Sequence, residues 1–423
     1  MRKNKEKIIF DIAVIGGGPS GMIAAGRAAE LGANVVLLEK KEKLGRKLLM
    51  TGKGRCNLSH AEFQSRKFIK GFGKNGNFLL STLSVFNVED TINFFEQQGL
   101  KTKIERGKRV FPSTNKAHSV LGVLIKYLRK GKVTILPNTK VVSIKVIEGE
   151  IDYLFLNKKR RIKAKKYIIC TGGKSYSVTG STGDAFKWAK KLNHSVVRLK
   201  PALVPLKTKE KWVKEVQGLG LKNVEISIFQ DNQKKEKMFG EALFTHFGMS
   251  GPIILKMSKK IGEFLEKGTV ELKIDLKPAL SFTELDKRIQ RDFKKGSKKM
   301  FKNSLSNLMP NRLIPLVVRF SGIDSSKYVS GITKEERHGL VRTMKGIKLR
   351  IMSLLDLNKA IVTSGGISLK EIDSKTMKSK LIKNLFFAGE VIDLDGTTGG
   401  YNLQMCWSTG YVAGQSASLE INK

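Results

Sequence analysis

The sequence predicts an α/β protein that opens with a parallel β-sheet and continues into a separate β-rich and helical region. Three observations lead to this fold class. The first 39 residues alternate strand, helix and strand, which is typical of a β-α-β unit. The character changes at Pro201, where strand-like and then helical segments follow, and a glycine-rich segment returns after about residue 351. A chain of 423 residues is long enough for two or three domains.

The predicted elements follow in chain order. The apolar run 8–16 predicts the first strand, 21–31 a helix and 33–39 the second strand. Further strands, rich in β-branched residues, are predicted at 132–136, 139–147, 152–156 and 166–170, and beyond Pro201 at 224–229 and 270–276. Residues 281–345 have the pattern of amphipathic helices, interrupted at Pro310 and Pro315.

Composition excludes several classes of protein. With 40% hydrophobic and 27% charged residues, the chain is neither collagen-like, nor of low complexity, nor disordered. No apolar run approaches the roughly 18 residues that span a bilayer, and Asp11 interrupts the only stretch that resembles a signal peptide. The three cysteines are widely spaced, which predicts a reducing, cytoplasmic compartment, and neither they nor the five histidines have metal-ligand spacing.

The charge is strongly unbalanced. There are 79 Lys and Arg against 37 Asp and Glu, a net charge of +42. Residues 1–194 contribute +25, 195–350 contribute +17, and 351–423 are neutral. An AT-rich genome, which raises the lysine content, accounts for part of this excess but not for the scarcity of acids. The charge favours nucleic acid as partner over an anionic membrane surface, although any single cluster, such as 158–166 or 294–299, reads equally well as a solvated face.

A dinucleotide-binding motif lies directly after the first strand. Gly16, Gly18 and Gly21 have the spacing G-x-G-x-x-G at the start of the predicted helix. This pattern supplies a tight turn, a bare backbone for a pyrophosphate and helix N–H groups that point at it. Glu39 ends the next strand, where a carboxylate accepts hydrogen bonds from ribose hydroxyls. A second match at 71–76 follows no strand, and we interpret it as a turn.

The C-terminal stretch 384–414 is similar to a segment of glutathione-reductase-like flavoproteins. A strand ends in Ala388-Gly389-Glu390, and a glycine-rich turn leads into a helix from about Asn402. The resemblance implies that FAD is the dinucleotide, that Glu390 lies against it, and that the helix N-terminus points at the flavin ring. It also implies that both ends of the chain form one Rossmann-like FAD-binding domain. The segment 168–173 resembles the Ala-Thr-Gly strand end of the same superfamily.

A narrower resemblance rests on six motifs. RKLLMTGKGRCN at 46–57, FPST at 111–114, TGSTGD at 179–184, PALVP at 201–205, FTHFGMSGP at 244–252 and GGYN at 399–402 together resemble the BaiN/RdsA (YhiN-like) flavoproteins, nearly end to end. Lys53 and Ala185 depart from that family's pattern. The resemblance implies an FAD domain at 1–194 and 351–423, interrupted by a β-barrel-like part at 195–280 and 335–350 and a helical part at 281–334.

The resemblance also implies the FAD-binding residues. Besides the glycine motif and Glu39, it indicates positions in the loops that follow the sheet strands and at the start of the last helix: Ser20, Lys40, Arg46, Lys47, Thr51, Gly54, Arg55, Asn57, Val141, Thr171, Gly172, Gly173, Glu390, Gly400, Asn402 and Leu403.

The activity that the resemblance implies is reduction of an activated carbon–carbon double bond. One branch of the family reduces uridine of ribosomal RNA to dihydrouridine, and another reduces steroid enones of the bile-acid type. The charge of +42 favours RNA, namely 23S ribosomal RNA or a ribosome precursor. No second dinucleotide motif is present, so NADH or NADPH is expected to visit the flavin transiently.

The proton donor for this reaction is a separate question. Cys56 is the first candidate. A neighbouring cation, Arg55, favours its thiolate, however, which makes Cys56 a better nucleophile but a poorer proton donor. Tyr401, His246 and bound water are the alternatives. Arg46, Lys47, Lys53 and Arg55 are expected near the flavin, where some contact FAD phosphate and others RNA.

Overall fold

The computed structural model describes residues 9–421, which divide into two compact units. Unit 1 comprises residues 9–202 and 357–421, and unit 2 comprises residues 203–356. The sequence predicts that the inserted region begins after residue 194 and ends at residue 350, whereas unit 2 begins after residue 202 and ends at residue 356. The reason is that strand β10 (Val196–Ala202) pairs with β17 (Val362–Ile367), which keeps both strands in unit 1.

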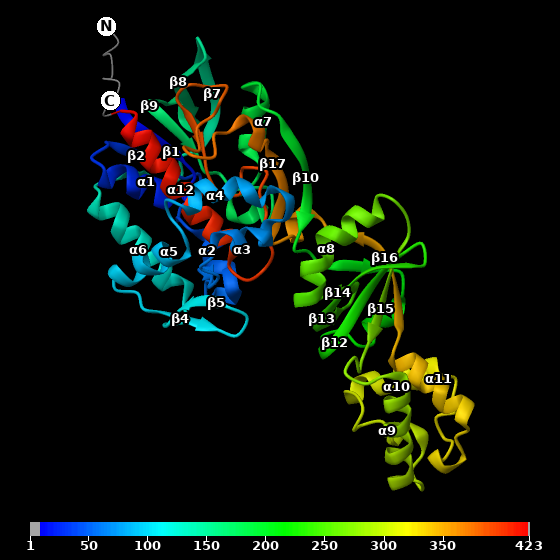
Figure 1. Ribbon diagram of the computed structural model, residues 1–423. Helices are drawn as coiled ribbons and strands as arrows, with labels where there is room; N and C mark the ends of the chain where they lie inside the picture. Colours follow the sequence, from blue (N-terminus) through cyan, green and yellow to red (C-terminus); the bar gives the residue numbers. More distant parts are fainter. Residues whose placement is uncertain (1–8, 422–423) are drawn as a thin grey trace. The chain divides into compact units, whose positions relative to one another are not determined.

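Unit 1 is built on a seven-stranded sheet with the order β6-β2-β1-β9-β8-β7 and with β18 beside β9 (Figure 1). Strand β9 divides one edge between two partners: its start pairs antiparallel with β8 and its end pairs parallel with β18. The other pairs around β1 and β2 are parallel. The strands are β1 (Ile9–Ile15), β2 (Val35–Leu38), β6 (Thr134–Leu136), β7 (Val141–Ile147), β8 (Glu150–Leu156), β9 (Arg161–Ile169) and β18 (Leu385–Phe387).

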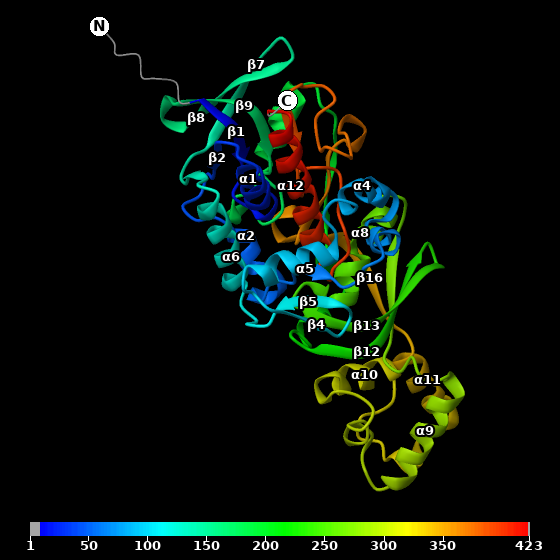
Figure 2. The same cartoon turned by 60° about the vertical axis from the view of Figure 1, so that its left-hand side comes forward.

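The first and last helices of unit 1 lie side by side, as Figures 1 and 2 both show in blue and red. Helix α1 (Pro19–Glu30) contacts α12 (Tyr401–Leu419) through glycines. A Cβ on Gly410 would lie 2.5 Å from the carbonyl oxygen of Ser20, and one on Gly414 would lie 2.2 Å from that of Ala24. Only bare backbone permits this approach. The prediction that the two chain ends share one α/β domain is therefore confirmed.

The remaining elements of unit 1 surround this sheet. A small three-stranded sheet has the order β3-β5-β4. Its strands and the other helices are β3 (Ser59–His60), β4 (Thr102–Glu105), β5 (Arg109–Pro112), α2 (Arg46–Met50), α3 (Ser65–Phe68), α4 (Leu80–Leu83), α5 (Val88–Gln97), α6 (Ala117–Lys130) and α7 (Asp184–Lys191).

Unit 2 contains the β-barrel that the resemblance implied. Six antiparallel strands close in the order β11-β14-β13-β12-β15-β16. Helix α8 (Pro252–Leu265) packs on the barrel with Ile254, Met257 and Ile261 fully buried. The strands are β11 (Leu206–Thr208), β12 (Gly220–Gln230), β13 (Gln233–Thr245), β14 (Gly248–Ser250), β15 (Val270–Asp275) and β16 (Ile347–Leu354).

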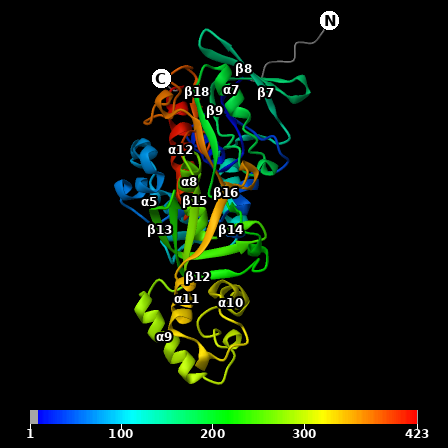
Figure 3. The ribbon, with the colours of Figure 1, turned by 90° about the vertical axis from the view of Figure 1, so that its right-hand side faces the viewer.

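Three helices gather at one end of this barrel (Figure 3): α9 (Phe282–Lys295), α10 (Ile314–Ser321) and α11 (Lys334–Met344). Trp212 joins them to the barrel, because its ring contacts Phe244 of β13 and Phe320 of α10. The expected end of the helical part at 334 is wrong. Thr333 and Glu336 form a capping box that starts α11, so residues 335–344 are helical rather than β-rich.

Within residues 9–421, no helix is both long and apolar enough to cross a bilayer, and no group of three His, Cys, Asp or Glu side chains is arranged to hold a metal ion.

Candidate functional site

The glycine-rich turn connects β1 to α1, and its glycines are needed for two different reasons. Gly16 has a φ of 109°, and a Cβ there would lie 2.5 Å from the carbonyl oxygen of Cys170. A Cβ on Gly21 would lie 1.9 Å from the carbonyl oxygen of Gly16. Gly18 has an ordinary φ of −82° and no atom within 4 Å of its Cβ position. The fold therefore requires Gly16 and Gly21, whereas Gly18 leaves the first turn of α1 open to a ligand.

Glu39 fixes the chain after β2 against this turn. Its two carboxylate oxygens accept the backbone N–H groups of Gly17, at 2.9 Å, and Lys41, at 2.8 Å. Each oxygen keeps a lone pair, so the carboxylate can still accept from ribose hydroxyls. Two neighbouring candidates use their side chains within the protein. Lys40 Nζ lies 2.7 Å from Asp184 Oδ2, and the buried Ser20 hydroxyl lies 3.4 Å from the carbonyl oxygen of Ala388.

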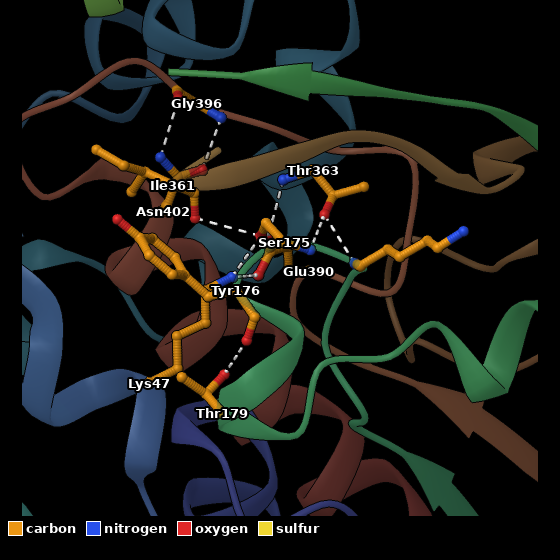
Figure 4. A network of polar contacts seen from close by, with 10 residues as sticks. Lys47, Ser175, Tyr176, Thr179, Ile361, Thr363, Glu390, Gly396 and Asn402 are labelled. Atoms are coloured by element: carbon orange, nitrogen blue, oxygen red, sulfur yellow. Dashed lines mark hydrogen bonds and ion pairs between the residues drawn. The ribbon is translucent and has the colours of Figure 1, made fainter. Parts of the chain in front are cut away.

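A charged network joins the loops at the carboxyl ends of the strands (Figure 4). Glu390 accepts from Lys47 Nζ at 2.7 Å, from Ser175 Oγ at 3.0 Å and from the backbone N–H of Thr363 at 2.8 Å. Thr363 Oγ1 in turn accepts the N–H of Ser175 at 3.0 Å. A Cβ on Gly173 would lie 2.4 Å from the same oxygen. The network thereby holds the loop after β9 in one position and neutralises the Lys47 charge.

The side chain of Asn402 closes the turn before α12 with two hydrogen bonds. Asn402 accepts the N–H of Gly396 and donates to its carbonyl oxygen, both at 2.8 Å (Figure 4). Gly400 has a φ of 106°, and a Cβ there would lie 2.1 Å from the carbonyl oxygen of Ser59. Leu403 is buried beneath the first turn. The glycines before α12 therefore allow the chain to pass close to β3. The first four N–H groups of α12 have no partner within the helix, as in any α-helix.

Two buried polar atoms of the candidate residues have no partner within the described part of the protein: Asn57 Oδ1 and Thr171 Oγ1. Buried polar atoms are nearly always hydrogen-bonded, so such an atom calls for a partner outside the chain. Four further orphaned atoms belong to Ser418 and to residues of unit 2. The residues present thus fit a bound dinucleotide: a bare turn, an acid with spare acceptor capacity, and orphaned polar atoms on two predicted positions.

The loop 51–57 departs from the expectation for Cys56. Arg55 turns away from the thiol: its guanidinium lies 4.0 Å from the centre of the Phe111 ring and pairs with Glu105 and Asn115. Cys56 has no exposed surface, and burial raises the pKa of its thiol to about 12. The expected thiolate stabilised by a neighbouring cation is therefore wrong, because desolvation outweighs any nearby charge.

Tyr401 lies in an aromatic cluster that the sequence analysis missed. Its ring stacks on His60 at 4.4 Å and lies 4.8 Å from Phe68. A Cβ on Gly71 would lie 2.5 Å from the Tyr401 ring, so the second glycine motif, expected to be a turn, is part of a 3-10 helix (Ile69–Leu79), kinked at Gly73, that packs against this side chain. Burial raises the pKa of Tyr401 above its usual range, which keeps the phenol protonated.

The other candidates are dispersed. Arg46, Lys53 and Gly54 are exposed, Thr51 donates to the carbonyl oxygen of Leu48, and Val141 is buried at the start of β7. Gly172 has a φ of 72° beside Ser181. His246 lies in unit 2, between β13 and β14. Sequence reasoning missed Ser175 and Thr363. The only signal for Thr363 is the glycine pair that follows it two residues later on a wholly buried strand.

Comparison with known families decides the assignment. The family described as HI0933-like protein Rossmann domain matches residues 10–416. The chain belongs to the HI0933-like family. It is 30% identical to the 3-dehydro-bile acid delta(4,6)-reductase of Clostridium scindens, over 96% of this chain and 98% of that protein. It is 28% identical to the ribosomal RNA dihydrouridine synthase of Haemophilus influenzae, again over 96% and 98%.

Solved structures agree on the fold of this HI0933-like protein. The open conformation of a flavocytochrome c3 fumarate reductase superposes with a TM-score of 0.53 at 17% identity, covering 98% of this chain and 79% of that chain. The protein is thus a flavoprotein oxidoreductase of mixed α/β fold, with a Rossmann-type FAD-binding domain and a closed six-stranded barrel.

Proposed function

We propose that this HI0933-like protein is an FAD-dependent reductase that converts a uridine of 23S ribosomal RNA, or of a ribosome precursor, to dihydrouridine in the cytoplasm. NADH or NADPH supplies the two electrons. A relative of 28% identity carries the name ribosomal RNA dihydrouridine synthase. Unit 1 is the FAD-binding domain in this proposal, and unit 2 contributes to substrate binding.

The chemistry is common to both kinds of relative. The C5=C6 bond of uracil is conjugated to the C4 carbonyl, as the double bond of an enone is conjugated to its carbonyl. When bound, FAD supplies a hydride for the carbon β to that carbonyl, and an acid must protonate the α carbon. The uracil has to leave its stack first, because its ring face is otherwise covered by neighbouring bases.

In this scheme, the protein's own residues bind and orient the cofactor. The glycine turn and the first turn of α1 receive the pyrophosphate, and Glu39 receives the ribose. Lys47 is held by Glu390 and Ser175 at the strand ends. Asn57 and Thr171 offer their orphaned oxygens to the cofactor. Tyr401 keeps its proton and is only partly buried, so it is preferred as the proton donor over Cys56, which has no exposed surface.

One observation carries the choice of RNA: the chain has 79 basic and 37 acidic side chains, and the excess lies entirely within residues 1–350. A steroid pocket gains nothing from such a charge. RNA binding gains directly, because each cation that contacts a phosphate releases a counterion.

Mass spectrometry of ribosomal RNA tests the proposal. In a strain that lacks this gene, we expect one uridine of 23S ribosomal RNA to lose its two-hydrogen mass increment, and the parent gene to restore it. A Tyr401→Phe gene should restore it incompletely while the purified variant keeps its flavin absorbance. An unchanged RNA profile in the deletion strain would contradict the RNA substrate.

A second candidate is favoured by the relative at 30% identity, which is named a bile acid reductase. In that case the protein reduces a small steroid enone and needs no RNA. The discriminating measurement is NADH or NADPH oxidation by the purified flavoprotein with a 3-oxo-4-ene steroid as sole acceptor. Turnover that added RNA does not inhibit favours the enone reductase, whereas absence of turnover favours RNA.

A further inference from the structure

Helix α9 of unit 2 carries a positively charged face opposite its buried face. Leu285, Ile289 and Phe293 are buried in the core of unit 2, where α9 packs against α11 and the 3-10 turn Val329–Gly331. At 100° per residue, four exposed cations fall within an arc of about 100° on the other side of the helix: Lys287, Arg291, Lys294 and Lys295. The loop after α9 continues the charge with three more exposed lysines, Lys298, Lys299 and Lys302. We refer to these seven residues as the cationic ridge.

The acidic side chains near the ridge are held mainly by groups outside it. Hydrogen bonds with Ser281 lower the pKa of the exposed Glu284, and Lys287 contributes to this shift only in part. Asp286 binds Arg337 at 2.6 Å, and Glu336 binds Lys327 at 2.8 Å. Glu284 caps its own helix through Ser281. Asp292 lies 3.6 Å from Arg288, which is why Arg288 is not counted in the ridge. Among the described residues, no carboxylate lies within 4 Å of a ridge cation.

Repulsion around Arg291 disfavours the helix when nothing is bound. Lys287 and Lys295 each lie four residues from Arg291, and like charges at this spacing destabilise a helix. Three features offset the repulsion: the capping box at Ser281, the buried apolar face and the lysines of the last turn, which favour the helix dipole. A surface whose cations are exposed, with no carboxylate within 4 Å among the described residues, is complementary to a polyanion, and lysine ammonium groups bind phosphates as point charges.

We propose that the cationic ridge of α9 is the surface on which unit 2 binds the phosphate backbone of the RNA substrate. This inference rests on the proposed function, because the latter names RNA as substrate. The ridge contacts phosphates and reads no base sequence, so it adds affinity and speed of association to every RNA. Recognition of the uridine to be reduced belongs to the site in unit 1.

The test compares two quadruple variants of the full-length flavoprotein. The ridge variant carries Lys287→Gln, Arg291→Gln, Lys294→Gln and Lys295→Gln; glutamine has nearly the helix propensity of lysine and arginine, so α9 should persist. The control variant carries Lys207→Gln, Lys209→Gln, Lys211→Gln and Lys214→Gln. It removes the same charge from exposed positions of the same unit, where Glu210 lies between the lysines and Glu215 follows them. Binding of an oligouridine RNA is measured from about 50 to 200 mM salt.

We expect the salt slope of the ridge variant to fall by about 0.7 for each lost contact with single-stranded RNA. Four lost contacts make the parent lose about 50-fold more affinity than the variant over that salt range. The control variant should keep a slope close to that of the parent. Equal slopes for the ridge variant and the parent, or equal losses in both variants, would overturn the inference.

Two further measurements separate this inference from the proposed function. Vesicles rich in phosphatidylglycerol should not compete with the RNA for the ridge; competition that the ridge variant abolishes would assign the surface to membranes and overturn the inference. If the ridge variant loses RNA binding while deletion of the gene leaves ribosomal RNA unchanged, the ridge remains an RNA-binding surface and only the proposed reaction fails.

Discussion

The charges at the strand ends of unit 1 and those along α9 of unit 2 are arranged in opposite ways. In unit 1, Lys47 pairs with Glu390 and Lys40 pairs with Asp184, both at 2.7 Å. In unit 2, no carboxylate of the described residues lies within 4 Å of a cation of the ridge. A paired and largely buried charge fixes the position of a loop, whereas an exposed and unpaired one is available to a ligand. The net charge of +42 therefore combines two kinds of cation with different tasks.

The largest effect is expected where the site depends on bare backbone. Gly21→Ala places a Cβ 1.9 Å from the carbonyl oxygen of Gly16 and 3.2 Å from the Cβ of Cys170, and the backbone of Gly16 cannot move aside easily. We expect a loss of about 3 kcal/mol or more in the free energy of unfolding, since overpacking of this kind costs at least 1–3 kcal/mol. Gly18→Ala is the matched control, because no atom lies within 4 Å of the new Cβ.

Gly18→Ala should therefore unfold like the parent protein while its FAD content falls, because the methyl group narrows the approach to α1. Chemical denaturation and flavin absorbance measure the two effects separately. A Gly21→Ala protein as stable as the parent would show that the turn is looser than described.

The next effect tests the paired charges. Glu390→Gln leaves Lys47 without its anion in a site where the two side chains are only 12% and 22% exposed. We expect a loss of about 2 kcal/mol, less than the 3–5 kcal/mol of a fully buried pair because water still reaches this one. Adding Lys47→Met should recover part of the loss. A double-mutant cycle measures the coupling, and a coupling near zero would mean that the pair does not fix the loop.

The sequence predicts the parts of this site that are local. Gly16, Gly18, Gly21 and Glu39 lie within one β-α-β unit, where spacing along the chain defines position in space. The contact between Ser175 and Thr363 joins residues 188 positions apart, and no short motif encodes it. The same limit applies to side-chain direction within a motif.

Arg55 illustrates that second limit. It precedes Cys56 in the sequence, yet its guanidinium binds Glu105 and Asn115, which come from the small sheet and the loop after it. For the fold, the strands of the large sheet, two strands of the barrel (β12 and β15) and the barrel itself were predicted from alternation and from the family resemblance, whereas the small sheet and the other strands were missed. The boundaries near 195 and 335 were not predicted, because pairing of β10 with β17 and the capping box of α11 decided them.

A smaller effect concerns a buried histidine of unit 1. His194 is 3% exposed; its Nε2 lies 2.9 Å from Ser379 Oγ and its Nδ1 lies 3.1 Å from Glu371 Oε2. Burial lowers the pKa of His194, although Glu371 opposes the shift. The unfolded chain then binds a proton that the folded chain refuses, so stability is full above about pH 6.5 and falls as the pH drops below it.

We expect the free energy of unfolding to decrease between pH 6.5 and 5.5 by up to about 1 kcal/mol, measured by thermal or chemical unfolding. His194→Gln should show a flatter profile over the same interval. The lowered pKa of Glu371 acts in the same direction but only at more acidic pH, so it does not mask the result. An identical pH profile for the variant and the parent would assign the acid sensitivity to other groups.

The smallest effect has the opposite sign, and it sharpens the comparison most. Arg291→Gln alone removes four like-charge pairs on α9, with Lys287 and Lys295 at a spacing of four residues and with Arg288 and Lys294 at a spacing of three, and it leaves the last-turn lysines that favour the helix dipole. Each such pair destabilises a helix by about 0.2–0.5 kcal/mol, so the RNA-free variant should be more stable than the parent by about 1 kcal/mol. The gain should shrink in high salt, which screens exposed charges but leaves the effect of Glu390→Gln nearly unchanged. Removing a charge thus destabilises the protein where charges are paired and stabilises it where like charges are crowded. An Arg291→Gln protein less stable than the parent at low salt would mean that this cation has partners within the protein.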